Sequence, residues 1–304
     1  MGKIIVTGAS GQFGNAAAKQ LLEIVPAEDL VFLSRTPEKL AEFAETGAHI
    51  RCADFDDPAS LPAAMEGGER MLLISTARVG TRVGQHTNAA RAAAAAGVRQ
   101  IAYTSIINCD RPDNPAIVKN DHLATEQAIR ATGVEYTFLR DNQYSEAIAL
   151  AMAIPALQMG VKPDNCGQGR VGFVSRDDCV NVAVGVLTQE GHGNHAYPVT
   201  GPEAISIPEA MAMVSQMAGK PIEVQHVDDE GMFAYFDSLG VPRHASDIVP
   251  DGPIPWSSDD MVTFGTAIRA GFMDEVSDCV ERITGKTPRT LRSVFEQYQG
   301  AWPV

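Results

Sequence analysis

The feature that most constrains the fold is a glycine-spaced turn near the amino terminus. An apolar run at residues 4–6 is typical of a buried parallel strand, and glycines follow it at three-residue spacing. A residue without Cβ lets the chain turn tightly and approach a diphosphate, and a helix start then offers unpaired N–H groups. A tight turn without a ligand is the alternative. We favour a dinucleotide site made by Gly8, Ala9, Ser10, Gly11, Gln12, Phe13 and Gly14.

Composition and charge narrow the class of protein. With 304 residues, of which 45% are hydrophobic, the chain can bury a core without disulfides. The five cysteines form no C-x-x-C pair, so we expect no metal site and a reducing, cytoplasmic location. A net charge of −14 argues against nucleic acid as a partner. We find no signal-peptide pattern and no run of roughly eighteen apolar residues, and therefore expect neither secretion nor a membrane span.

Strand-like and helix-like patterns alternate beyond the turn. Strands are expected at residues 4–6, 30–33, 48–52, 71–74, 100–104, 133–139 and 197–200. This alternation predicts an α/β fold with a Rossmann-type, doubly wound parallel sheet. We divide the chain into a dinucleotide-binding core (1–145), a substrate-side crossover (146–165), final sheet elements (166–202) and a smaller, mostly helical substrate-side region (203–304).

The residue after the second strand indicates which dinucleotide is bound. An acidic residue there would accept hydrogen bonds from the ribose 2′-hydroxyl of NAD. The chain instead has Arg35, with Lys39 a helical turn later. A guanidinium suits the 2′-phosphate of NADP because it forms charge-assisted hydrogen bonds. A solvated basic residue is the alternative, and we favour NADP(H) over NAD(H).

Further candidate cofactor contacts lie directly after other predicted strands. Residues after the third strand are placed to meet the adenine, and small or hydroxylated residues after the fourth leave room for the cofactor. Asp56 and Asp57 are expected only to cap the next helix. The candidates are Asp54, Phe55, Ser75, Thr76 and Ala77, together with Thr104 and Ser105 at the end of the fifth strand.

Several segments, at 6–14, 34–35, 72–75, 101–105, 122–126, 136–140, 167–169 and 174–178, carry a family resemblance. Together they resemble the NmrA-like branch of atypical short-chain dehydrogenases, and within it NADPH-dependent quinone oxidoreductases and triphenylmethane reductases. The resemblance implies the same Rossmann fold with NADPH as cofactor. It implies cofactor contacts at residues 8–13, Arg35, the turn that ends at Arg78, Asp141 and the segment that contains Arg176.

The catalytic pair of short-chain dehydrogenases is missing from this chain. Those enzymes place a serine at the end of the fifth strand, where Thr104 and Ser105 stand here, and a Tyr-x-x-x-Lys pair on the next helix. In this alignment His122 and Glu126 replace the Lys-x-x-x-Glu of extended relatives, and Val118 replaces the tyrosine. One turn separates His122 from Glu126, so a bonded pair is sterically natural. A structural role and a cofactor-side contact remain alternatives for His122.

The segment after the sixth strand is expected above the nicotinamide. Tyr144 is the tyrosine that we place near the reacting carbon, either as a proton donor or as a stacking surface. Tyr144 and His122 are therefore the candidate catalytic residues. The family has Arg-Asn where this chain has Arg140 and Asp141, and an ionised carboxylate accepts but does not donate.

Two functions remain open. The first is an NADPH-dependent reductase that transfers hydride to a conjugated, quinone-like or aromatic small molecule, whose reduced oxygen solvent can protonate. The second, implied by the resemblance, is a regulator that senses NADP(H) without turnover. A loop at 242–256 either closes over the substrate, with Trp256 in contact, or is a surface excursion. The sequence is compatible with a homodimer.

Overall fold

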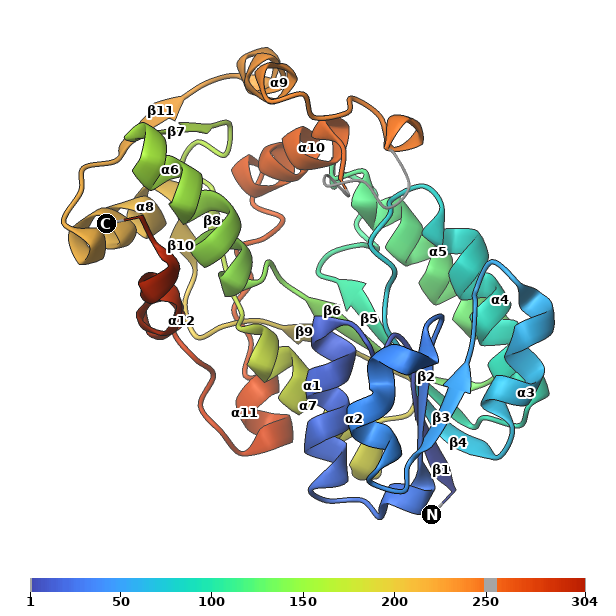
Figure 1. Ribbon diagram of the computed structural model, residues 1–304. Helices are drawn as coiled ribbons and strands as arrows, with labels where there is room; N and C mark the ends of the chain where they lie inside the picture. The colour runs from blue at the N-terminus through green and yellow to red at the C-terminus, as the bar shows by residue number, and fades with distance from the viewer. Residues whose placement is uncertain (1, 249–255, 304) are drawn as a thin grey trace.

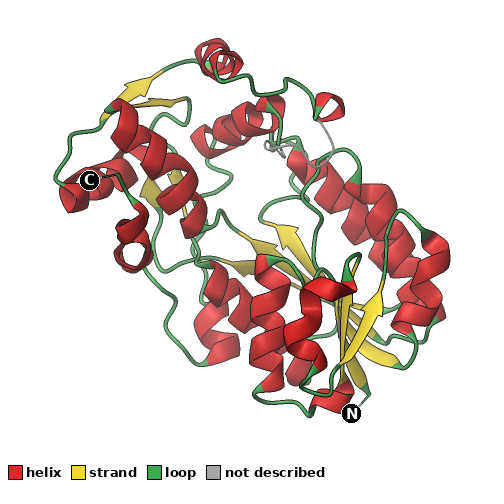
Figure 2. Cartoon of the chain, in the orientation of Figure 1, coloured by secondary structure: helices red, strands yellow, loops and turns green. Residues whose placement is uncertain are grey.

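The centre of the protein is a seven-stranded parallel sheet (Figures 1 and 2), seen in a computed structural model that describes residues 2–248 and 256–303. The strand order is β3-β2-β1-β4-β5-β6-β9. Chain order reverses between β1 and β4, which is the switch point of a doubly wound sheet. The strands are β1 (Lys3–Val6), β2 (Leu30–Ser34), β3 (His49–Cys52), β4 (Gly68–Leu73), β5 (Gln100–Ile106), β6 (Glu135–Asp141) and β9 (His195–Val199). The predicted Rossmann-type α/β fold is confirmed.

Helices cover both faces of the sheet, and the inner strands β1, β2, β4 and β5 are buried on both of their faces. Ile4 and Val6 point toward one layer and Ile5 toward the other, and all three are fully buried. The first layer contains α1 (Gln12–Leu22) and α7 (Arg176–Thr188), with α2 (Ala41–Ala44) nearby. The second contains α3 (Leu61–Met65), α4 (Arg82–Ala95) and α5 (Val118–Ala131).

Strands β5 and β6 each run two residues further at their carboxyl ends than the sequence predicts. We expected β5 to close at Thr104 and β6 at Leu139, but their pairing continues to Ile106 and Asp141. Neighbouring side chains on a strand point to opposite faces of the sheet. Thr104 and Ser105 therefore face different layers, as do Arg140 and Asp141.

Most of the remaining elements form a smaller, largely helical region beyond the ends of β5 and β6 (Figure 1). We expected such a region over residues 203–304, and the observed one already includes elements from residue 147 onward. It begins with a π-helical segment, η4, and includes two short two-stranded sheets, β8 with β10 and β7 with β11. Its elements are η4 (Ala147–Met152), α6 (Ala153–Met159), β7 (Val161–Asp164), β8 (Arg170–Val171), β10 (Ile205–Ser206), α8 (Ile207–Ala218), β11 (Glu223–His226), α9 (Asp229–Ser238), α10 (Ser258–Arg269) and α12 (Leu291–Tyr298). Helix α11 (Cys279–Thr284) lies between α10 and α12 in the sequence but packs elsewhere.

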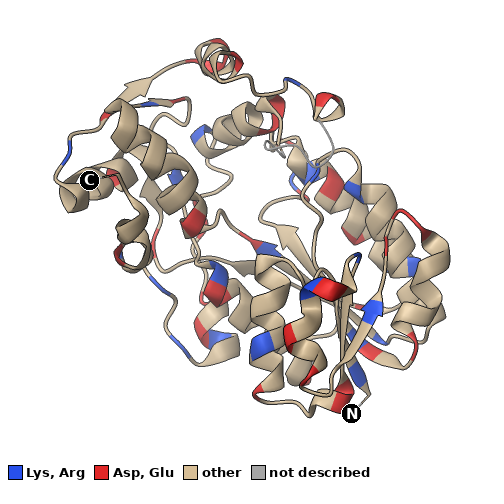
Figure 3. Cartoon of the chain, viewed as in Figure 1, with Lys and Arg blue, Asp and Glu red and all other residues tan. Residues whose placement is uncertain are grey.

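The C-terminal part of the chain also returns to the sheet. Helix α11 packs on α7 and β9, and its residues Val280 and Ile283 join the core of the first layer. Our division of the chain at residues 145, 165 and 202 remains an interpretation, and α11 supplies core to the dinucleotide-binding part from beyond residue 203. Lys and Arg are interspersed with Asp and Glu over both parts (Figure 3). No helix in the described ranges has the length and apolar character needed to span a bilayer.

A buried ion pair ties α5 to the sheet. Glu126 is fully buried and accepts two hydrogen bonds from the guanidinium of Arg140, Nε to Oε1 at 3.0 Å and Nη2 to Oε2 at 2.9 Å. Ser105 donates to the same carboxylate at 2.7 Å, and Arg130 lies 3.5 Å from it. Such a paired fork satisfies a charge that would otherwise be costly to bury.

The Glu126→Gln variant should therefore be strongly destabilised, by about 3 kcal/mol, because the arginines lose their buried counter-charge. The matched control is Glu42→Gln, which removes the exposed ion pair with Lys19 and should leave stability nearly unchanged. Urea unfolding measures both variants. Equal stability of the two would contradict a role for Glu126 in holding α5.

Candidate functional site

The turn between β1 and α1 is shaped by close backbone contacts. Gly8 has a φ of +59°, and the N–H of Gly11 donates to its carbonyl oxygen at 2.9 Å. A Cβ on Gly14 would lie 2.3 Å from that same oxygen, so only glycine lets α1 pack this close to the turn. The start of α1 has neither a side-chain cap nor an acidic residue in its first turn. A cradle of this kind, with uncapped N–H groups, fits a diphosphate.

The end of β2 lies beside this turn. The hydroxyls of Ser10 and Ser34 are 3.0 Å apart, which brings the predicted loop residue next to Arg35. Arg35 and Lys39 are exposed. Arg35 forms no ion pair among the described residues, so its guanidinium is free for an anionic ligand.

The turn after β4 is held by hydrogen bonds from three directions. The N–H of Ile74 donates to Thr7, that of Ser75 to Oγ1 of Thr104 at 2.8 Å, and that of Thr76 to His86 at 3.0 Å. The structure thus brings the turns after β1 and β4 and the end of β5 together. Ala77 is exposed and Arg78 half-buried in the continuation of this turn.

The residues after β3 lie half-buried at the same edge of the sheet. Asp54 accepts the N–H of Asp56, and the carbonyl oxygen of Phe55 accepts a bond from Asn88 at 3.0 Å. Asp57 caps the following turn through the N–H of Ala59, as predicted. Contacts of Asp54 and Phe55 with adenine stay a prediction.

His122 does not pair with Glu126. Its ring instead lies between Arg82, whose Nη1 is 3.1 Å from Nε2, and Tyr103, whose hydroxyl is 2.9 Å from Nδ1. A guanidinium only donates, so Nε2 accepts and Nδ1 carries the proton. Burial, with the charge of Arg82, holds the pKa of His122 well below its ordinary value. Both nitrogens of a neutral ring are engaged inside the protein, which favours the structural alternative for His122.

His86 extends the same network. The N–H of Thr76 donates to its Nε2, and Nδ1 lies 3.0 Å from the hydroxyl of Thr125. Burial, with the charge of Arg82, lowers the pKa of His86 to about 3, so the ring is neutral. This network fixes the turn after β4 to α4 and α5. His86, Arg82 and Tyr103 could not be recognised from the sequence, because their partners lie up to 40 positions away and form no local motif.

Asp141, which is buried, and Tyr144, which is half-buried, form a second polar group on the α1 and α7 side of the sheet. The phenol donates to Oδ2 of Asp141 at 2.8 Å, and the guanidinium of Arg176 lies 5.6 Å from the centre of the Tyr144 ring. Burial, and next the charge of Asp141, raise the pKa of Tyr144 well above its usual value. The proton of Tyr144 is thus directed to Asp141, which weakens the proton-donor alternative for this tyrosine.

The predicted Ser105 and Arg176 sites have partners inside the protein. The hydroxyl of Ser105 faces Glu126 and is 4% exposed as a residue, so it belongs to the α5 ion pair described above. The N–H of Arg176 donates to the buried carboxylate of Glu146 at the start of α7, while its side chain stays half-buried over Tyr144. Cofactor contacts at both positions stay predictions.

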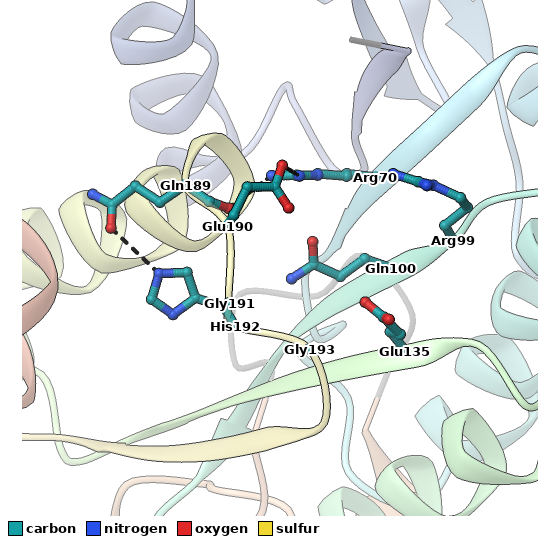
Figure 4. A pocket seen from close by; sticks show the side chains of 9 residues that line it. All are labelled: Arg70, Arg99, Gln100, Glu135, Gln189, Glu190, Gly191, His192 and Gly193. Carbon is teal, nitrogen blue, oxygen red and sulfur yellow. Dashed lines mark hydrogen bonds and ion pairs between the residues drawn. The ribbon is translucent and has the colours of Figure 1, made fainter.

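A polar pocket lies at the opposite, amino edge of the sheet (Figure 4). Its buried Arg70 donates to the carbonyl oxygens of Leu187 and Gln189 and pairs with Glu190. These bonds anchor the end of α7 to β4. The pocket is lined by Arg70, Arg99, Gln100, Glu135, Gln189, Glu190, Gly191, His192 and Gly193. It is separate from the dinucleotide cradle.

Of the loop predicted at 242–256, residues 249–255 lie outside the described part of the chain. Trp256 is half-buried and stacks edge-on with Phe236, with the ring centres 5.6 Å apart. His244 bonds to Asp259 at 2.5 Å. Substrate contact by Trp256 stays a prediction.

The glycine cradle and the switch-point sheet define a dinucleotide-binding protein of the Rossmann type. A family model described as NAD(P)H-binding matches residues 8–190. Quinone oxidoreductase 2 of Escherichia coli is 35% identical over 251 residues, which cover 83% of this chain and 87% of that protein. An NmrA-like family domain-containing oxidoreductase of Aspergillus flavus is 26% identical over 75% of each chain.

Solved structures agree with these relationships. The E. coli NADPH-dependent quinone oxidoreductase complexed with NADPH superimposes with a TM-score of 0.87 and 32% identity over 97% of this chain and 99% of that one. The Citrobacter sp. triphenylmethane reductase complexed with NADP(H) gives 0.83 and 29%, with the same coverage. The chain belongs to the NAD(P)H-binding family, and its similarity to an NmrA-like oxidoreductase and to quinone and triphenylmethane reductases agrees with the resemblance found in the sequence.

We expect alanine substitutions at Gly14 and Gly84 to have opposite effects on stability and different effects on NADP⁺ binding. Gly14→Ala places a Cβ against the backbone of Gly8 and should weaken NADP⁺ binding and cost about 1–3 kcal/mol of stability. Gly84→Ala, on the exposed face of α4 with no atom within 4 Å, should add about 0.5–1 kcal/mol and leave binding unchanged. Fluorescence titration and urea unfolding measure both effects. Unchanged NADP⁺ affinity in Gly14→Ala would argue against the cradle.

Proposed function

We propose that this protein is a reductase that uses NADPH to reduce conjugated, quinone-like small molecules. The observation that carries the proposal is the glycine cradle beside the free guanidinium of Arg35. When bound, NADPH supplies a hydride from its nicotinamide ring. The turns after β1, β3 and β4 offer the surface on which its two nucleotides would lie, at the switch point of the sheet. Relatives named as quinone and triphenylmethane reductases support the same acceptor class.

The preference for NADPH rests on charge at the end of β2. Arg35 follows Ser34, whose hydroxyl is bonded to Ser10 of the cradle, so a ribose held by the cradle would lie near the guanidinium. A guanidinium binds a phosphate through short, charge-assisted hydrogen bonds. The adenosine ribose of NAD has no 2′-phosphate for this side chain to bind.

The choice of acceptor follows from the residues on α5. Val118 stands where short-chain dehydrogenases carry tyrosine, and His122 is neutral with both nitrogens engaged. A simple ketone needs a proton as the hydride arrives, because an alkoxide is strongly basic. A quinone yields a far less basic oxygen that water can protonate. The site therefore suits acceptors that do not depend on a tyrosine–lysine pair.

Steady-state oxidation of NADPH tests the acceptor class. We expect turnover with a panel of substituted 1,4-benzoquinones and naphthoquinones to exceed turnover with simple ketones by at least about a hundredfold. This is the lower end of the rate factor that a positioned proton donor contributes, and ketone reduction here would lack such a donor. Faster reduction of ketones would overturn the proposal. Tight NADPH binding with no turnover of any acceptor would instead support the sensing function.

Replacing Arg35 tests the cofactor preference. Arg35→Ala should weaken NADPH binding about 10–100-fold, because a charged hydrogen bond contributes about 1.5–3 kcal/mol, and should change NADH binding little. The matched control is Arg91→Ala, an exposed arginine on α4, which should alter neither affinity. Isothermal titration with both dinucleotides measures the effect. Equal losses for NADPH and NADH would show that Arg35 does not read the 2′-phosphate.

A further inference from the structure

Asp141 holds a buried carboxyl oxygen that has no partner. The residue is 5% exposed at the carboxyl end of β6, and its Oδ2 accepts the Tyr144 hydroxyl. Its Oδ1 is buried and makes no hydrogen bond within the described ranges. Burying an unpaired polar atom is costly, and burying it as part of a negative charge costs more. The surroundings therefore match the neutral, protonated carboxyl better than the ionised one.

No cation faces Asp141 directly among the described residues. Arg140, its neighbour on β6, points to the other layer and is engaged by Glu126. Arg176 of α7 stacks on the ring of Tyr144 and forms no ion pair with Asp141. The carboxyl thus lacks the partner that usually keeps a buried aspartate ionised.

The other groups around Asp141 are thiols and acids. Cys179 of α7 and Cys279 of α11 are buried thiols whose pKa values burial raises, so both stay neutral. The acids Asp178 and Glu146 also lie close enough to Cys179 for their charges to raise its pKa. Burial raises the pKa of Asp141 to about 7, although the hydroxyl of Tyr144 and the nearby thiol of Cys179, which makes no hydrogen bond of regular geometry to Oδ1, lower it.

Asp141 also lies on the side of the sheet that carries the dinucleotide cradle. Leu139, two residues earlier on β6, belongs to one apolar cluster with Ala9 and Phe13 of the cradle. Tyr144, the hydrogen-bond partner of Asp141, packs against the same cluster. A ligand that extends from the cradle along the carboxyl edge of the sheet would reach the end of β6 on this side.

We infer that Asp141 serves this site in its protonated form, with Oδ1–H donating a hydrogen bond to a carbonyl oxygen that a ligand brings to the end of β6. The inference rests on the proposed function, which supplies two such oxygens: the carboxamide of the nicotinamide and the carbonyl of a quinone-like acceptor. Ionisation removes the donor and places a negative charge against the carbonyl oxygen. As pH rises through neutrality, either the affinity for the ligand or the rate of hydride transfer therefore falls.

The test compares the wild-type protein with Asp141→Asn, whose amide donates at every pH. We expect the ratio of the wild-type Kd to the variant Kd for NADP⁺ to rise about tenfold between pH 6 and pH 8. The titration of the ligand's own phosphate affects both proteins equally and therefore cancels in this ratio. If the acceptor carbonyl is the partner, the Kd ratio stays constant. The single-turnover rate of NADPH oxidation by 1,4-benzoquinone then shows the tenfold fall instead.

Tyr144→Phe and Asp177→Asn complete the design. The hydroxyl of Tyr144 lowers the pKa of Asp141, so Tyr144→Phe should shift the midpoint of the pH dependence upward, a change that a merely structural role does not produce. Asp177 is exposed on α7, so Asp177→Asn should keep the wild-type profile.

The free protein gives a readout that needs no cofactor. The fold favours protonated Asp141, so its contribution to stability is complete below the ordinary pKa of 3.8 and is lost as pH rises through about 7. The melting temperature of Asp141→Asn minus that of the wild type should therefore be roughly several degrees larger at pH 8 than at pH 6.

Three results would count against the inference or its basis. Matching pH profiles of NADP⁺ binding and of hydride transfer in the wild type and Asp141→Asn would overturn the inference alone. An unshifted midpoint in Tyr144→Phe would do the same, even if Asp141→Asn failed to fold. Absence of NADP(H) binding by the wild type at every pH would instead overturn the proposed function.

Discussion

The close approach of α1 to the turn after β1 is the constraint on which the site depends. Gly14 meets the carbonyl oxygen of Gly8 at a distance that excludes any Cβ, and this contact sets where α1 begins. The helix then presents its uncapped N–H groups toward the carboxyl edge of the sheet. Because the strands are parallel, the turns after β2 and β4 arrive at the same edge. This backbone contact thus positions the diphosphate cradle, and the hydrogen bonds of Thr7, Thr104 and His86 position the turn after β4 beside it.

Beside that surface, the protein uses buried polar groups to fix its geometry. His86 and His122 are neutral, and each is oriented by a donor that leaves one tautomer: a backbone N–H for His86 and Arg82 for His122. A neutral ring with both nitrogens bonded behaves as a rigid connector between elements. Where short-chain dehydrogenases place a tyrosine and a lysine, α5 here provides attachment to the turn after β4.

The fold was largely predictable from local patterns, since apolar runs and turn residues report burial and chain reversal directly. The predicted strands and the glycine turn were found at the expected positions. Strand ends were less predictable: β5 and β6 continue because they pair with each other, which moved Ser105 to the α5 layer and Asp141 to the other. The expected pair between His122 and Glu126 was wrong because each side chain found a partner distant in sequence, Tyr103 and Arg140. The spacing of two residues along a helix does not reveal which distant side chains will bind them instead.

Helix α11 has a consequence for how the chain becomes folded. It lies near the end of the sequence, yet Val280 and Ile283 complete the apolar layer that supports the cradle at residues 8–14. During synthesis the first strands emerge long before this layer can close. Part of this apolar layer therefore stays open on the nascent sheet until α11 has been synthesised, a period in which chaperones have access to it.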